Sequence, residues 1–149
     1  MASGPASNDA EGGGDRRPDE LSVLGRTVRH PIDHVECFPA PAGCSRVRFS
    51  TDELSSVCPV TAQPDLSSLV IEYVPGRYCI ESKSLKLFLW SFRDRPIFAE
   101  ALAAAIATEV MTTVEPQWVQ VTVTQRPRGG IATTAVSEMG TEASPQRSP

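Results

Sequence analysis

The chain lacks the features that mark a membrane protein or a general nucleic-acid-binding protein. None of its apolar runs approaches the ~18 to 20 residues that span a bilayer, and no basic segment followed by an apolar one stands at its start. The 14 Lys and Arg are outnumbered by 18 Asp and Glu, which gives a formal net charge of -4 and a pI near 5.2. A nucleic-acid-binding protein normally presents a basic face. We therefore expect a cytoplasmic protein that acts on a small molecule, with no membrane partner and no direct nucleic-acid partner.

Motifs for common cofactors and metals are also missing. No Gly-x-Gly-x-x-Gly turn is present, so a standard Rossmann dinucleotide site has no support. The two histidines, His30 and His34, straddle Pro31 and do not share a regular helix face, which argues against a metal site. Without a secretory signal, the cysteines are expected to be free thiols rather than disulfides. They are Cys37, Cys44, Cys58 and Cys79.

Length and composition predict one folded domain. With 149 residues, 40% of them hydrophobic, the chain is long enough for one core and too short for two comfortable domains. Residues 1–20 and 136–149 are rich in Gly, Ala, Pro, Ser and charged residues, so we expect both to be disordered tails. The folded domain then comprises residues 21–135.

The first half of this domain reads as an arm and two strands. Residues 21–41 are broken by one glycine and three prolines, which predicts an extended arm. Residues 46–50 alternate apolar and polar side chains, and residues 69–74 are β-branched and aromatic, so both are expected to be strands. Between them, residues 51–65 contain two prolines and several Ser and Thr, and we expect an irregular loop.

The second half reads as two helices followed by two strands. Apolar residues recur at helical spacing in residues 85–92, with Ser82 or Ser84 near the start of that helix, and again in residues 98–114. Residues 118–124 alternate strictly, and residues 131–135 follow a Gly-Gly turn. The order ββααββ predicts an α+β fold, an antiparallel sheet with both helices on one face. Its open edges favour a homo-oligomer.

The loop of residues 51–65 carries the chemistry-bearing side chains Cys58 and Asp65. A loop thiol serves as a nucleophile if surrounding donors lower its pKa. The alternative is a buried, inert cysteine, which is the more frequent case. Asp65 is equally well explained as a loop carboxylate that caps the next turn. Spacing alone therefore favours the structural explanation for both residues.

Three longer strings of residues change this balance. The string Cys58-Pro59-x-Thr61-x-Gln63-Pro64-Asp65 is followed by Glu81-Ser82-Lys83-Ser84-Leu85-Lys86-Leu87-Phe88, and later by Arg126-Pro127-Arg128-Gly129-Gly130-Ile131. Together they resemble the single-domain (type I) nitrile reductases of the queuosine pathway, the QueF family. The resemblance covers residues 21–135 and implies a tunnelling fold (T-fold) assembled into an oligomeric barrel, a pentamer or a decamer.

The family's reaction is the NADPH-dependent four-electron reduction of the nitrile of 7-cyano-7-deazaguanine to 7-aminomethyl-7-deazaguanine, in the biosynthesis of queuosine, a tRNA modification. The resemblance assigns to Cys58 the attack on the nitrile carbon, which gives a covalent thioimide, and to Asp65 the role of general acid. A thiolate is a soft nucleophile suited to this electrophile.

The resemblance also implies binding residues. The substrate-binding positions are Ile80, Glu81, Ser82, Ala99 and Glu100, and the cofactor-binding positions for NADPH are Lys83 and Lys86. Lys83 and Lys86 are three apart and are expected on one side of the helix. Without the resemblance, the two lysines would be assigned to a solvated face, and Glu100 to compensation of the helix dipole.

One position departs from the family pattern, because Ala99 stands where the family has histidine. Three alternatives to the reductase remain. One is a relative that forms an amidine from the same thioimide without NADPH, against which the two lysines argue. Another is a zinc-dependent cyclohydrolase-like enzyme, for which the ligands are missing. The third is a non-catalytic deazaguanine-binding module. The sequence leaves open the number of subunits, the effect of Ala99, the role of the tails, and whether the product feeds tRNA modification or a specialised deazapurine pathway.

Overall fold

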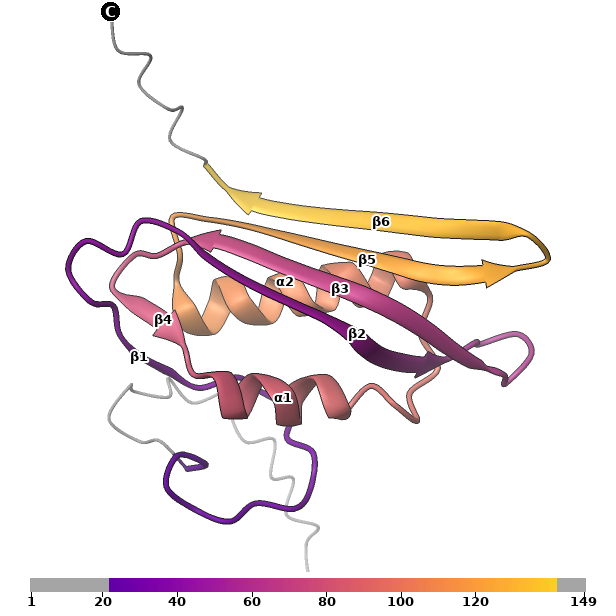
Figure 1. Cartoon of the computed structure of the whole chain (residues 1–149), viewed down its shortest axis with the longest axis horizontal. Coiled ribbons are helices and arrows are strands. Elements are labelled where there is room, and N and C mark those ends of the chain that lie inside the picture. Colours follow the sequence, from indigo (N-terminus) through magenta and orange to yellow (C-terminus); the bar gives the residue numbers. More distant parts are fainter. Residues whose placement is uncertain (1–21, 142–149) are drawn as a thin grey trace, which may run out of the picture.

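The computed structural model describes residues 22–141, which form a four-stranded antiparallel sheet covered on one face by two helices (Figure 1). The strands lie in the order β2-β3-β5-β6, so β2 and β6 are the edges. The bounds are β2 (Val47–Val57), β3 (Pro64–Val74), α1 (Ser82–Trp90), α2 (Ala99–Val114), β5 (Trp118–Arg128) and β6 (Ile131–Gly140). The expected ββααββ order and α+β class are confirmed.

A small two-stranded sheet lies beside the main one. The expected extended arm contributes β1 (Cys37–Pro39), which pairs antiparallel with β4 (Tyr78–Ile80) directly before α1. The hydroxyl oxygen of Tyr73, a fully buried residue of β3, accepts a hydrogen bond of 2.9 Å from the backbone N–H of Ile80. This bond ties the small sheet to the core, so it fixes where α1 begins.

The strands are longer than the sequence pattern indicated. Pairing of β2 with β3 continues past a bulge between Thr51 and Leu54 and ends at Val57 opposite Pro64. The expectation of an irregular loop over residues 51–65 was therefore wrong, and only residues 58–63 connect the two strands. The bulge and the many Ser and Thr break the alternation by which a strand is identified in sequence.

The C-terminal boundary also needs correction. Strand β6 continues to Gly140, so residues 136–140, which were expected in a tail, belong to the sheet. Their alternation is weak because β6 is an edge strand and buries little of its surface. The expected tail segments 1–20 and 142–149 lie outside the described residues.

Helix α2 supplies much of the core. Leu102, Ile106 and Val110 recur every four residues and are 0–1% exposed, packed with Val121 and Val123 of β5. The predicted spacing is thus confirmed. No helix between residues 22 and 141 is both long and apolar enough to cross a membrane.

We expect Tyr73→Phe to lower the free energy of unfolding by about 1–3 kcal/mol, because the buried N–H of Ile80 would lose its acceptor. Urea unfolding curves, fitted with the same dependence of the free energy on urea concentration for each variant, measure this difference. Tyr78→Phe, on the neighbouring strand and half-buried, is the matched control, with an expected change within about 0.5 kcal/mol. Equal stability of Tyr73→Phe and the wild type would contradict the role of this bond.

Candidate active site

The connection between β2 and β3 winds tightly around Cys58. The backbone N–H of Cys58 donates to the carbonyl of Gln63 at 2.9 Å, and the N–H of Ala62 donates to the carbonyl of Cys58 at 2.9 Å. Ala62 adopts a left-handed conformation with φ of 60°, which alanine tolerates only at a cost. The loop therefore holds the cysteine, which is 6% exposed, in one conformation.

The donors around the sulfur make Cys58 unlike two of the other cysteines. The hydroxyl of Thr61 and the guanidinium of Arg128, with the backbone N–H groups of Thr61 and Val60, lower the pKa of the Cys58 thiol to about 6. Burial instead raises the pKa of Cys37 and of Cys79. Cys58 thus has the electrostatics of a nucleophile, and the explanation as an inert buried thiol is disfavoured.

Asp65 lies beside this loop on the core-facing side of β3. Its side chain is 3% exposed, and Nη2 of Arg128 is 3.0 Å from its Oδ1. The contact is electrostatic rather than a hydrogen bond, since Oδ1 has no hydrogen-bond partner among the described residues. The hydroxyl of Ser67, two residues further along, is buried and also without a partner. Buried polar atoms without partners are rare in folded proteins, so these two are candidates for contact with a bound ligand.

The start of α2 reaches the same end of the sheet. Val57 exchanges backbone hydrogen bonds with the segment before α2, donating to the carbonyl of Arg95 at 3.0 Å and accepting from the N–H of Ile97 at 3.1 Å. Ala99 and Glu100 follow at once in the first turn of α2. Ala99 is buried at 4% exposure and packs in the core, whereas Glu100 is exposed.

The other expected substrate-binding residues lie at the opposite end. Ser82 and Phe49 line one cavity beside α1, whereas Cys58 directly follows the end of β2, nine residues after Phe49. At ~3.3 Å per residue this separation is at most roughly 30 Å. One protomer therefore does not bring Ile80, Glu81 and Ser82 together with Cys58.

Glu81 has a clear structural task at this opposite end. It is the N-cap of α1, and its two carboxylate oxygens accept hydrogen bonds of 2.8 Å from the backbone N–H groups of Lys83 and Ser84. This cap satisfies N–H groups that would otherwise lack partners at the start of the helix. The cap was not apparent from the sequence, which suggested Ser82 or Ser84 near the start.

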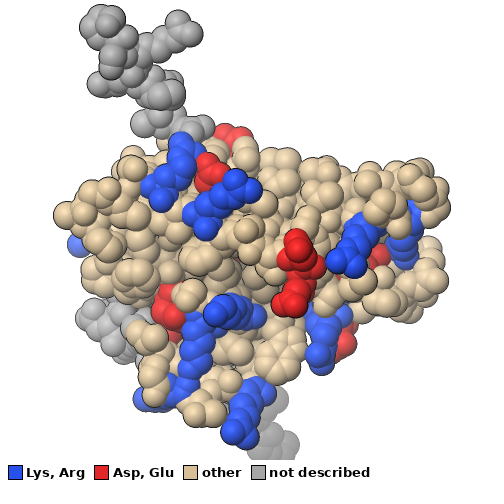
Figure 2. All heavy atoms as spheres, in the orientation of Figure 1, with Lys and Arg blue, Asp and Glu red and all other residues tan. Residues whose placement is uncertain are grey.

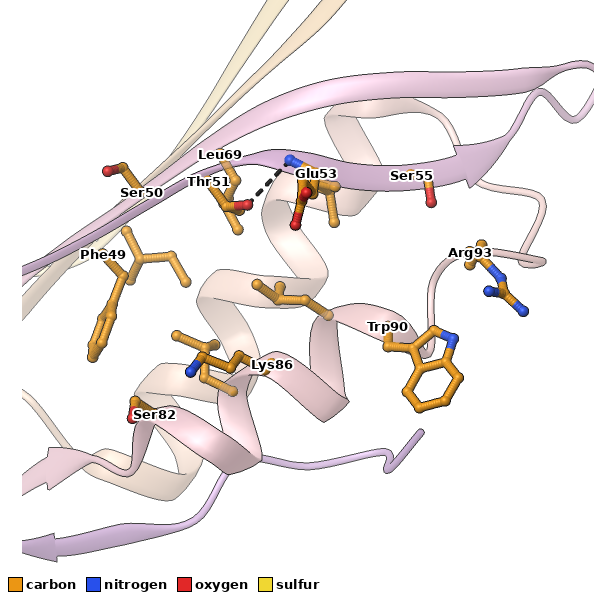
Figure 3. A pocket seen from close by; sticks show the side chains of 14 residues that line it. Phe49, Ser50, Thr51, Glu53, Ser55, Leu69, Ser82, Lys86, Trp90 and Arg93 are labelled. Carbon is orange, nitrogen blue, oxygen red and sulfur yellow. Dashed lines mark hydrogen bonds between the residues drawn. The ribbon is translucent and has the colours of Figure 1, made fainter. Parts of the chain in front are cut away.

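The two expected cofactor lysines have different surroundings. Nζ of Lys83 donates to the carbonyl of Val23 at 2.8 Å and to the carbonyl of Arg26, so it holds the N-terminal arm. Lys86 is exposed and lines a cavity of about 450 Å³ between α1 and the strands β2 and β3 (Figure 3).

This cavity, which we call the α1 cavity, has an apolar floor and a polar rim. Leu54, Leu69 and Leu85 contribute to its floor. Trp90 and Arg93 lie at the end away from Ser82, toward the Cys58 end of the sheet (Figure 3). On this face of the molecule, basic side chains stand in small separate groups with acidic ones between them (Figure 2). Such a cavity is in the size range of small-molecule sites.

The sequence did not single out Arg128 as a site residue. It was visible only as part of the Arg126–Ile131 segment, and its approach to Cys58 depends on the pairing of β5 with β3. The hint in the sequence was a cation directly before a Gly-Gly turn, in which both glycines have positive φ. Among the described residues, no group of three or more His, Cys, Asp or Glu is placed to hold a metal.

The low pKa of Cys58 predicts selective alkylation. Iodoacetamide reacts with the thiolate, whose fraction rises as pH rises through the pKa, so the rate at Cys58 should reach half its maximum near pH 6. Cys37 and Cys79 should stay unmodified at that pH because their pKa values are raised. Mass mapping of peptides after timed labelling measures all three. A midpoint near the ordinary value of 9.0 for Cys58 would contradict the geometry described above.

Known proteins match this chain over most of its folded part. It is 40% identical over 117 residues to an NADPH-dependent 7-cyano-7-deazaguanine reductase of Granulibacter bethesdensis, a match that covers 74% of this chain and 76% of that one. It is 49% identical over 85 residues to the enzyme of that name from Brucella abortus, covering 57% of this chain and 55% of that one.

A solved structure shares the fold. The crystal structure of the archaeosine synthase QueF-Like in the apo form matches with a TM-score of 0.62 and 31% sequence identity, covering 66% of this chain and 97% of that one. The family model described as QueF-like protein matches residues 64–144. These matches confirm the resemblance drawn from the motifs, and the chain belongs to the QueF-like protein family.

Proposed function

We propose that this protein is a nitrile reductase that converts 7-cyano-7-deazaguanine to 7-aminomethyl-7-deazaguanine with NADPH, as a step of queuosine biosynthesis. The observation that carries the proposal is the low-pKa thiol of Cys58 in a rigid loop with the buried carboxylate of Asp65 beside it. The names of the curated relatives support the same substrate and cofactor.

The first chemical step needs only groups at the Cys58 end of the sheet. The thiolate of Cys58 adds to the nitrile carbon, and the nitrile nitrogen takes up a proton, which leaves a thioimide. The thiol loses one proton and the nitrogen gains one, and we assign to Asp65 the transfer of this proton between them. The buried hydroxyl of Ser67, which has no partner in the described part of the chain, is available to hydrogen-bond the polar atoms that form.

NADPH supplies the hydrides that reduce the thioimide, two per nitrile. We assign its phosphates to Lys86 and Arg93 on the rim of the α1 cavity, and Trp90 offers an aromatic face there. Lys83 stands next to this rim, and two of its three N–H groups are used by the arm. Its third N–H, for which residues 22–141 offer no acceptor, remains for a phosphate oxygen.

The deazaguanine base of the substrate would be bound by the segment before α1 and by Glu100. The carboxylate of Glu81 accepts two backbone N–H groups, yet each oxygen has a second lone pair that can accept from the edge of a guanine-like base. Ile80 and Ser82 flank it with backbone groups. Ala99 cannot donate or accept a proton as the family's histidine can, so in this proposal Asp65 alone transfers protons.

These two halves of the site meet only if two protomers contribute. Four large apolar side chains near the Cys58 loop are exposed, namely Val60, Leu66, Phe98 and Ile131. Exposed apolar surface of this kind marks an interface. The free edges β2 and β6 can pair head to tail with neighbouring copies. We infer a homo-oligomer, a pentamer or decamer, located in the cytoplasm, whose reducing conditions suit four free thiols.

Mixing the protein with 7-cyano-7-deazaguanine should give a covalent adduct on Cys58 before NADPH is added. The protein mass should then increase by the full mass of one substrate molecule. With NADPH present, two equivalents should be oxidised per nitrile consumed. Cys58→Ala should abolish both signals, and Asp65→Asn should slow adduct formation by about 100-fold or more.

The cofactor stoichiometry separates the alternatives. An adduct without NADPH oxidation, followed by attack of ammonia or another amine, would identify an amidine-forming enzyme. Tight binding of the base without an adduct would identify a binding module. Ala99→His is the companion variant, and an unchanged rate would show that the missing histidine has no role in this chain.

A site shared between protomers predicts complementation. Glu81→Asn keeps a good helix cap but removes the carboxylate, so it should fold and be inactive. Co-assembled at equal amounts with Cys58→Ala, it should restore about a quarter of the wild-type rate, since both intact halves meet at random in a quarter of the interfaces. A mixture of Cys58→Ala protomers with Asp65→Asn protomers is the control. It should stay inactive, because both changes lie in the same half of the site. No recovery in the first mixture would place the whole site within one protomer.

A further inference from the structure

Arg128 contacts three side chains around the thiol loop from the end of β5. Its Nη1 donates to Oε1 of Gln63 at 3.1 Å and to Oγ1 of Thr61 at 3.4 Å, and its Nη2 lies 3.0 Å from Oδ1 of Asp65. Thr61 in turn is a donor to the sulfur of Cys58. One guanidinium therefore connects the loop, the nucleophile and the acid.

The position of Arg128 is fixed by the sheet. Strand β5 pairs with β3 up to Gln125, after which its pairing with β6 shifts register before Arg128. The pair Arg128 and Ile131 then closes the hairpin through two glycines of positive φ. Because the strand end is held by this turn, the side chain lies against the loop that enters β3.

We propose that Arg128 is a positioning residue, which holds the Cys58 loop in its reactive conformation with the carboxylate of Asp65 beside it. This role of Arg128 goes beyond the proposed reductase activity. Only its effect on the nitrile step rests on that activity. Its fork of N–H groups can serve the loop and the carboxylate at once, which a lysine ammonium does less well.

The charges balance through the first step. The S–H bond of Cys58 breaks, and Asp65 takes the proton; the S–C bond then forms as the nitrogen takes the proton from Asp65. Asp65 begins and ends as a carboxylate. The adjacent guanidinium stabilises the thiolate before attack.

The test compares Arg128→Gln, Arg128→Lys and the control Arg126→Gln, which alters an exposed arginine two residues earlier on β5. The first readout is the pH midpoint of iodoacetamide labelling at Cys58, without substrate or cofactor. Arg128→Gln should raise the midpoint by about one pH unit, which is about tenfold less thiolate below it. The midpoint of Arg128→Lys should lie between those of the wild type and Arg128→Gln, and the midpoint of Arg126→Gln should match that of the wild type. The midpoint is used because the maximal rate also changes with thiol basicity.

The second readout is the rate of nitrile adduct formation, again without NADPH, which should fall about tenfold or more in Arg128→Gln. An unchanged midpoint and adduct rate with only a raised KM for NADPH would overturn the proposal and make Arg128 a phosphate ligand. A shifted midpoint without any adduct in the wild type would instead refute the reductase and leave the positioning role intact. If Arg128→Gln loses its circular dichroism signal, Gln63→Met, which removes one anchor of the guanidinium, should shift the midpoint in the same direction by less.

Discussion

Antiparallel pairing of β3 with both β2 and β5 is the constraint on which the candidate site depends. Pairing with β2 brings Val57 opposite Pro64, so the six-residue connection that holds Cys58 must fold back sharply above Asp65. Pairing with β5 brings the end of that strand to the same place and delivers Arg128. Arg128 thus comes from a part of the chain far from Cys58 and Asp65, but from the strand next to the one that carries Asp65.

The region before α1 obeys a different constraint, which is the satisfaction of backbone groups. Glu81 caps the helix, Tyr73 accepts the N–H of Ile80, and the buried Glu36 accepts the N–H groups of Ser22 and Val23. These bonds hold the arm and the helix start as one unit. The carboxylate of Glu81 therefore has a structural role in this unit, as the cap of α1.

Particular residues show why the sequence predicted some features and missed others. Leu102, Ile106 and Val110 repeat with helical spacing and bury one face of α2, so the helix was predicted with its bounds nearly correct. The bulge after Thr51 breaks the alternation of β2, so more than half of that strand was assigned to a loop. Likewise, Lys83 and Lys86 were expected to act together, but the arm takes up the ammonium of Lys83, a contact 60 residues away in sequence.

The sequence by itself determined the class of the fold and the family, because periodicity and short motifs such as Cys58–Asp65 and Glu81–Phe88 are local properties of the chain. Only the tertiary structure decided which motif residues lie together. It placed Arg128 against Asp65 and separated Ile80, Glu81 and Ser82 from Cys58, because strand order and register are set by long-range pairing that no local pattern records. The thiol loop is accordingly both the feature most visible in the sequence and the one whose chemistry depends on residues far from it.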